Sequence, residues 1–148
     1  MNLLNCCKVS QAITPTNGAA DKVDIEAATL DMAGFDGVLV EVVMGAIVAL
    51  AETSLRIQQG TKSDGSDMAD LAGSKVTVEV AKAETIFLID LYRPQERYVR
   101  LIVDRAVANA TIASATYFQY QHSGKLPVVQ STEVTAQLQL ISPDEGTP

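Results

Sequence analysis

The sequence is poor in the side chains that most often carry catalysis or bind metal ions. Its 148 residues include one histidine, His122, and two cysteines, the adjacent Cys6 and Cys7. Adjacent cysteines rarely form a disulfide, because their Cα–Cα separation of about 3.8 Å is shorter than disulfide geometry prefers. The lack of a disulfide framework indicates folding in a reducing compartment. Since no further ligands stand at metal-binding spacing beside these cysteines, we expect no thiolate metal site and no cofactor.

The sequence also lacks the motifs of enzymes that use a nucleophile or bind nucleotide phosphates. A histidine-based nucleophilic site needs a base that is oriented by an acid. His122 instead lies in a glycine-containing loop, where an exposed histidine is the simpler interpretation. Neither of the common glycine-rich phosphate loops is present. We therefore expect no catalytic residues and predict that the protein is not an enzyme.

Basic residues are scarce and do not cluster. The net charge is −7, and an acidic surface repels phosphate backbones, so we expect no nucleic-acid partner. Arginines come closest together where acids alternate with them, which indicates a salt-bridged sheet edge. These residues are Arg93, Arg97, Arg100 and Arg105 with Asp90, Glu96 and Asp104.

Long apolar runs are absent as well. The longest, residues 38–51, is too short to span a bilayer and is interrupted by Glu41 and Gly45. The first eight residues lack the basic start and the sustained apolar core of a signal peptide. We expect a soluble protein without a membrane partner.

One dense acidic segment, residues 63–70, is a candidate cation site. Asp64, Asp67 and Asp70 are spaced three residues apart, and carboxylates at this spacing can bind a hard cation such as calcium. The spacing does not match a helix-loop-helix calcium loop, and no bidentate glutamate closes it. A solvated loop with a helix cap is the alternative interpretation.

Alternation of apolar and polar residues dominates the rest of the chain and predicts an all-β fold. Period-two patterns and apolar runs of strand length indicate about eight to nine strands, the number expected of a sandwich or barrel. They cover residues 23–27, 38–44, 53–58, 76–80, 86–91, 98–103, 112–121 and 133–140. Residues 93–96 are predicted to close a hairpin between two of these strands.

We expect at most one short helix and a single domain. Asp67 is a candidate N-cap for a helix over residues 68–72 that Gly73 would end. Residues 46–56 are a rival helix, because alanine and leucine favour helices. We predict a flexible N-terminal arm over residues 1–22, a sandwich domain over residues 23–141, and a disordered tail over residues 142–148.

Two stretches resemble a known family of proteins. The first is residues 31–40, with the sequence DMAGFDGVLV, leading to Gly45. The second is residues 82–92 followed by ERYVRL at residues 96–101. Their order is similar to small structural proteins of tailed-bacteriophage virions, most of all the head decoration, or cement, proteins. The resemblance runs from about Val23 to Val129.

The resemblance implies a jelly-roll β-sandwich that forms a homotrimer on the exterior of the capsid, assembled in the host cytoplasm. The partner would be the major capsid protein, whose adjacent subunits it would clamp without any catalytic residue. Candidate interface residues are Arg97, Tyr98 and Arg100, which match the motif, and Leu3 and Leu4, from an arm that could order along a neighbour. Two alternatives remain: a tail or head–tail joining protein, and a non-viral β-sandwich that binds a ligand.

Overall fold

Alternating sequence patterns become strands throughout most of the chain. The structure, a computed structural model, describes residues 2–140 and residue 145. These residues form ten strands, one short α-helix and one 3-10 turn. The elements are α1 (Leu3–Cys6), β1 (Lys8–Ile13), β2 (Ile25–Glu26), β3 (Leu30–Asp31), β4 (Phe35–Ile47), β5 (Glu52–Gly60), β6 (Ala69–Asp70), β7 (Val76–Val78), η1 (Val80–Lys82), β8 (Ile86–Tyr92), β9 (Tyr98–Ala106) and β10 (Ala110–His122).

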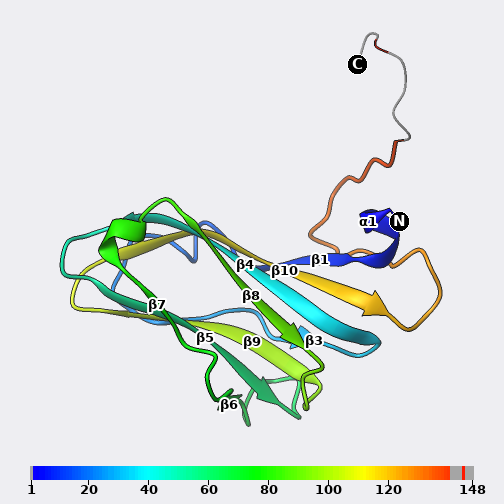
Figure 1. Cartoon of the computed structure of the whole chain (residues 1–148), viewed down its shortest axis with the longest axis horizontal. Helices are drawn as coiled ribbons and strands as arrows, with labels where there is room; N and C mark the ends of the chain where they lie inside the picture. The colour runs from blue at the N-terminus through cyan, green and yellow to red at the C-terminus, as the bar shows by residue number, and fades with distance from the viewer. Residues whose placement is uncertain (1, 141–144, 146–148) are drawn as a thin grey trace.

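The strands form two antiparallel sheets that face each other (Figure 1). The four-stranded sheet has the order β1-β10-β4-β8. The six-stranded sheet has the order β2-β9-β5-β6, with β3 also paired to β9 and β7 also paired to β5. The prediction of an all-β antiparallel sandwich is therefore confirmed. No helix in the described part of the chain is long and apolar enough to cross a membrane.

The core lies between the sheets and is built from one side of each long strand. On β4, Val38, Val40, Val42 and Met44 are buried, because alternate side chains of a strand point to the same face. β5, β9 and β10 contribute in the same way, which joins both sheets in one apolar cluster. Complete burial of a valine or leucine side chain is worth about 1.5–3 kcal/mol, so this face holds the sheets together.

The N-terminal segment differs from the predicted irregular arm. Residues 8–13 form β1, which pairs with β10 at the edge of the four-stranded sheet. Ala12 and Ile13 are buried in the core. The strand is short and its alternation is weak, so its pairing depends on β10, which is about a hundred residues further along the chain.

Three local predictions are wrong. Residues 69–70 pair with β5 as β6 instead of forming a helix, because a five-residue helix is too short to be stable by itself. The rival helix over residues 46–56 is replaced by the end of β4, a turn and the start of β5. Residues 93–96 close no hairpin, because β8 and β9 belong to different sheets.

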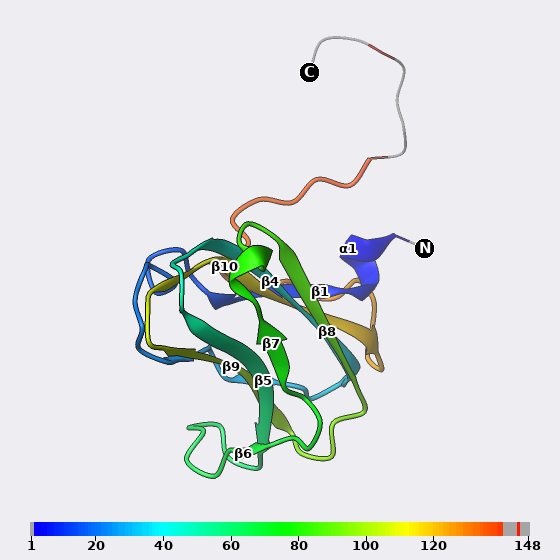
Figure 2. The same cartoon turned by 60° about the vertical axis from the view of Figure 1, so that its left-hand side comes forward.

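The C-terminal segment also differs from the structure predicted from its alternating sequence. Residues 133–140, predicted to be a half-buried strand, form none, and beyond Glu133 the chain runs away from the sandwich in both views (Figures 1 and 2). The predicted disordered tail, residues 142–148, lies outside the described residues apart from residue 145.

Candidate functional site

The four-stranded sheet carries apolar side chains on its outer side as well as on its core side. The pairing register places Leu39 beside Phe118 of β10, and Phe118 beside Val9 of β1. On the other side of β4, Glu41 and Val43 lie beside Leu88 and Ile86 of β8. We call this surface the outer apolar face: Val9, Leu39, Val43, Ile86, Leu88, Tyr92, Phe118 and Tyr120.

Part of the outer apolar face is strongly exposed. Ile86 is 59% exposed, Leu88 is 61% exposed and Tyr92 is 50% exposed. Single exposed apolar residues are ordinary, but Ile86 and Leu88 lie beside Val43 and form an apolar patch, which Asp90 separates from Tyr92. The face therefore has the character of an unpartnered interface.

A groove of about 830 Å³ lies at one end of the outer apolar face. Leu3 and Leu4 of α1 form one wall, Val9, Leu39 and Phe118 form the floor, and Leu126 forms the opposite rim. The lining is almost wholly apolar, so the groove suits the apolar side chains of a partner better than a polar small molecule.

Gln130 fixes the wall of the groove. Its side-chain oxygen accepts a hydrogen bond from the Val9 N–H at 2.9 Å. Its amide nitrogen donates to the carbonyls of Cys7 at 2.7 Å and Leu4 at 3.3 Å. At the start of α1, the Asn2 side chain accepts from the Leu4 N–H. One amide thus holds α1 and the start of β1 to the C-terminal segment.

Tyr120 crosses the face at a glycine. A Cβ at Gly37 would lie within 2.2 Å of the Tyr120 ring, so only glycine lets the ring lie over β4. The hydroxyl then donates to Asp90 of β8 at 2.6 Å. Burial and the hydrogen bond to Asp90 raise the pKa of Tyr120 to about 12. Tyr120 therefore stays protonated and joins β10 to β8 across the face.

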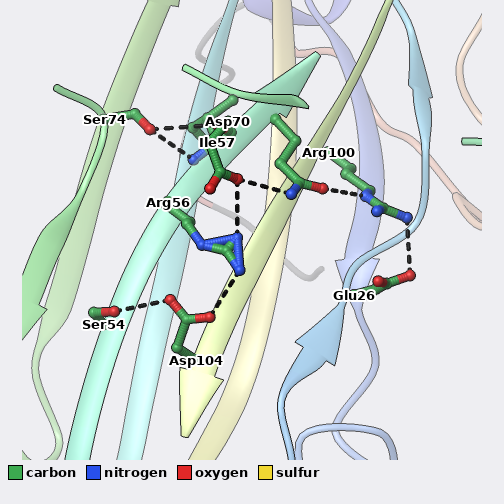
Figure 3. A network of polar contacts seen from close by, with 9 residues as sticks. Glu26, Ser54, Arg56, Ile57, Asp70, Ser74, Arg100 and Asp104 are labelled. Atoms are coloured by element: carbon green, nitrogen blue, oxygen red, sulfur yellow. Dashed lines mark hydrogen bonds and ion pairs between the residues drawn. The ribbon is translucent and has the colours of Figure 1, made fainter. Parts of the chain in front are cut away.

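The six-stranded sheet presents a very different outer face (Figure 3). Arg56 forms ion pairs of 3.0 Å with both Asp70 and Asp104. Arg100 donates to Gln58 at 2.8 Å and to Glu26 at 2.9 Å. Gln58 in turn donates to Asp70 at 2.7 Å, which connects the two groups. The charges on this face satisfy one another, which leaves little free charge to attract a phosphate or an acidic partner.

The predicted salt-bridged edge is wrong: within the described residues none of its arginines forms an ion pair with one of its acids, and β9, which carries Arg100, Asp104 and Arg105, is not an edge strand. Asp104 is ion-paired, but to Arg56 of β5 and not to a neighbouring arginine in sequence. Asp90 accepts from Tyr120 instead. Arg105 is buried and donates to the backbone carbonyls of Ala19, Val23 and Ala110.

The structure divides the predicted interface residues between the two sheets. Leu3 and Leu4 line the groove on the outer apolar face. Arg100 belongs to the polar network of the other sheet, and Tyr98 starts β9 in that sheet. Arg97 precedes β9 and binds Asp31 through two hydrogen bonds of 2.8 and 2.9 Å, which hold the pKa of Asp31 below its usual range. These five residues therefore do not form one site.

The remaining candidate groups each have a local structural role. Asp67 accepts from the backbone N–H groups of Thr61 and Lys62, and Asp64 accepts from that of Ser66. Asp70 faces Arg56. Within residues 2–140, no group of three histidine, cysteine, aspartate or glutamate side chains is arranged to hold a metal ion.

His122 and the cysteines lie near the groove without forming a reactive pair. The His122 ring stacks on Phe35 at 4.7 Å, and its Nδ1 lies 2.9 Å from the Gly34 carbonyl, to which it donates. Burial, together with Cys6, raises the pKa of the Cys7 thiol. A raised pKa lowers the thiolate fraction at neutral pH and with it the reactivity.

Sequence reasoning missed most of the outer apolar face. Residues 38–44 were predicted to be a strand, but their local pattern does not show which of their two apolar sides lies in the core. No family model and no curated protein matches the chain. The protein is therefore a β-sandwich with two different outer faces. The polar side chains of the six-stranded sheet form hydrogen bonds and ion pairs with one another, whereas the outer face of the four-stranded sheet is largely apolar.

Proposed function

We propose that this protein is a structural protein of a tailed-bacteriophage virion. In this role it binds the outer surface of the capsid and stabilises contacts between major capsid protein subunits. It acts as a homotrimeric sandwich of the jelly-roll type. The resemblance over residues 23–129 supports the virion assignment. The observation that carries the binding role is the outer apolar face with its groove, set opposite a face whose charges are already paired.

The mechanism is energetic and needs no chemical step. A stable protein–protein interface buries about 1,600 Å² in total. A copy that spans two shell subunits adds such an interface, which must be lost before the shell opens there. A few side chains that enter well-packed pockets, aromatic ones prominent among them, carry most of the energy of an interface. Phe118, Tyr92, Leu3 and Leu126 are the candidates for these anchors.

The two outer faces of the sandwich have different orientations on the capsid. The outer apolar face turns toward the shell, because apolar area gains free energy when it leaves water. The polar network around Arg56 and Arg100 turns toward the solvent, where paired charges need no partner. This orientation also places the groove, and not the predicted Arg97 and Arg100, against the capsid.

Co-sedimentation with capsids tests the proposal. The assay uses purified shells of the virus whose genome encodes this chain, prepared without the protein, and compares three variants. Leu3→Asp and Leu126→Asp alter exposed leucines at the groove, while Leu50→Asp alters an exposed leucine in the β4–β5 turn. All three make the same chemical change at an exposed position, so each variant should fold.

We expect each groove variant to lower the affinity for shells at least tenfold and Leu50→Asp to leave it unchanged. Loss of a buried leucine contact is worth about 1.5–3 kcal/mol, and about 1.4 kcal/mol is a tenfold change in affinity. Absence of wild-type binding to the shells would contradict the proposal. Assembly into a larger ring that binds tail components would favour the joining role, and capture of a small apolar ligand would favour the binding module.

A further inference from the structure

A segment with the pattern of a strand stands outside the sandwich. In residues 133–140, Val134, Ala136, Leu138 and Leu140 alternate with glutamate, threonine and glutamine. Leu138 is 74% exposed and Leu140 is 63% exposed, and the segment extends away from both sheets (Figure 2). Alternation of this kind is typical of a strand with one face buried. Within its own chain Val134 is half-buried, and Leu138 and Leu140 have no such burial.

The nearest sheet edge cannot accept the segment, because side chains already occupy it. Gln130 accepts a hydrogen bond from the Val9 N–H, and Glu133 accepts one of 3.1 Å from the Gln11 N–H. These two residues cover the free edge of β1. The chain then leaves this edge after Glu133.

The opposite edge of the same sheet, β8, is too far away in the same copy. It is three strands from β1 in the order β1-β10-β4-β8. At about 4.8 Å per strand, the distance is roughly 14 Å. At about 3.3 Å per residue, crossing it would use about four of the residues 134–140. Too few would remain to pair along β8.

β8 is an open edge without the usual protection. The Met44 N–H donates to the Thr85 carbonyl, and the Arg93 N–H donates to the Asp36 carbonyl. These two bonds, one at each end of β8, show that the odd-numbered residues of β8 are the ones that bond to β4. Alternate residues therefore direct their N–H and C=O groups away from β4: Ile86, Leu88, Asp90 and Tyr92. The pairing with β4 is regular over all seven residues, the strand contains no proline, lysine or bulge, and its one charged side chain, Asp90, accepts a hydrogen bond from Tyr120. A long, regular, apolar edge of this kind is a template for another strand.

The core is also incomplete beside this edge. Phe87, Ile89 and Leu91 point toward the core but are only partly buried. Val76 of β7 and Leu71, which directly follows β6, are likewise only partly buried against the core. A strand laid along β8 with its apolar side chains turned inward would cover this opening.

We infer that residues 134–140 of one copy pair with β8 of a second copy. The segment and β8 have the same length, seven residues. Its apolar side chains pack over Phe87, Ile89 and Leu91, while its polar side chains stay in solvent. Backbone hydrogen bonds provide affinity and the alternate side chains provide specificity, as in other cases of strand addition. Because each copy both donates and accepts a segment, the contact can repeat from copy to copy, and in the homotrimer of the proposed function it closes into a ring of three.

The oligomeric mass of the full chain in solution tests the inference. Leu138→Asp with Leu140→Asp changes the apolar side of the segment. Gln137→Asp with Gln139→Asp places the same two charges on its polar side and is the matched control. We expect the first variant to have the mass of one chain and the control to keep the mass of the wild-type oligomer. A wild-type protein that is a single chain, or an oligomer that survives the first variant, would overturn the inference.

A second measurement locates the contact. Amide exchange should be slow at Leu88 and Asp90 in the wild-type oligomer and fast in the Leu138→Asp, Leu140→Asp variant. Amides of residues 87, 89 and 91, which bond to β4, should be slow in both. Equal exchange at Leu88 in the two proteins would place the contact elsewhere. No capsid is present in either experiment, so a single-chain wild type would contradict the homotrimer of the proposed function but leave capsid binding intact, and failure of capsid binding leaves this inference intact.

Discussion

The hydroxyl of Tyr117 links the two sheets at the centre of the core, and its removal is a sharp test of the fold. Tyr117 lies on β10 and is 1% exposed. Its oxygen accepts a hydrogen bond of 2.9 Å from the Leu101 N–H of β9 and donates one of 3.0 Å to the Ala28 carbonyl. The substitution Tyr117→Phe removes this oxygen and keeps the ring.

The expected loss of stability depends on what happens to the two hydrogen-bond partners of the Tyr117 hydroxyl. The Leu101 N–H lies inside the sandwich, and a buried donor left without an acceptor costs about 1–3 kcal/mol. Ala28 is exposed, so water can replace the hydroxyl at its carbonyl. The aromatic ring stays, so no large cavity forms. We therefore expect Tyr117→Phe to lower the free energy of unfolding by about 2 kcal/mol.

Urea unfolding followed by circular dichroism measures this difference. The slope of the free energy of unfolding against urea concentration should stay the same, because the surface exposed on unfolding hardly changes. Tyr92→Phe is the matched control, since Tyr92 is half exposed on β8 and its change should stay within about 0.5 kcal/mol. A loss for Tyr117→Phe no larger than that of the control would refute the idea that this hydroxyl is a buried link between the sheets.

Two further predictions concern the groove and the response to alkaline pH. Gln130→Ala removes three hydrogen bonds that hold α1 and β1. We therefore expect weaker capsid binding and faster proteolysis of α1. The control Gln95→Ala, at an exposed glutamine, should change neither. Burial raises the pKa of Tyr117, and burial with the Asp90 hydrogen bond raises that of Tyr120 to about 12, whereas an unfolded tyrosine ionises near about pH 10. Because the unfolded chain then loses protons first, stability should be complete below about pH 10 and should fall as the pH rises toward 12. Urea unfolding at a series of pH values measures this, and a stability that stays constant over that range would contradict it.

Local alternation was sufficient to predict most strands but not their partners. Residues 76–78, 98–106 and 110–122 are strands near the predicted bounds, because β-branched and aromatic residues at period two favour this conformation. Partners depend on contacts between distant segments. The local sequence therefore could not predict that β1 lies at the edge of a sheet, or that β8 and β9 belong to different sheets.

The candidate site was predictable only in part for the same reason. Leu3 and Leu4 were identified as exposed apolar residues of the N-terminal segment, and they do line the groove. The remaining lining comes from β1, β4 and β10, which meet only through the sheet order. Arg97 and Arg100 stood out by their charge, but that charge is used within the chain. Alternation in residues 133–140 indicated a strand, and the open edge of β8 suggests that the strand forms between copies.

Electron cryo-microscopy of the virions encoded by the same genome tests the central claim most directly. Particles from the intact genome would be compared with particles from a genome that lacks this chain. We predict extra density on the capsid exterior at the junctions of major capsid protein subunits. The sandwich should fit this density with Leu3, Phe118 and Leu126 turned toward the shell. Identical capsid surfaces in the two particles, or a sandwich bound through the Arg56 and Arg100 face, would contradict the account.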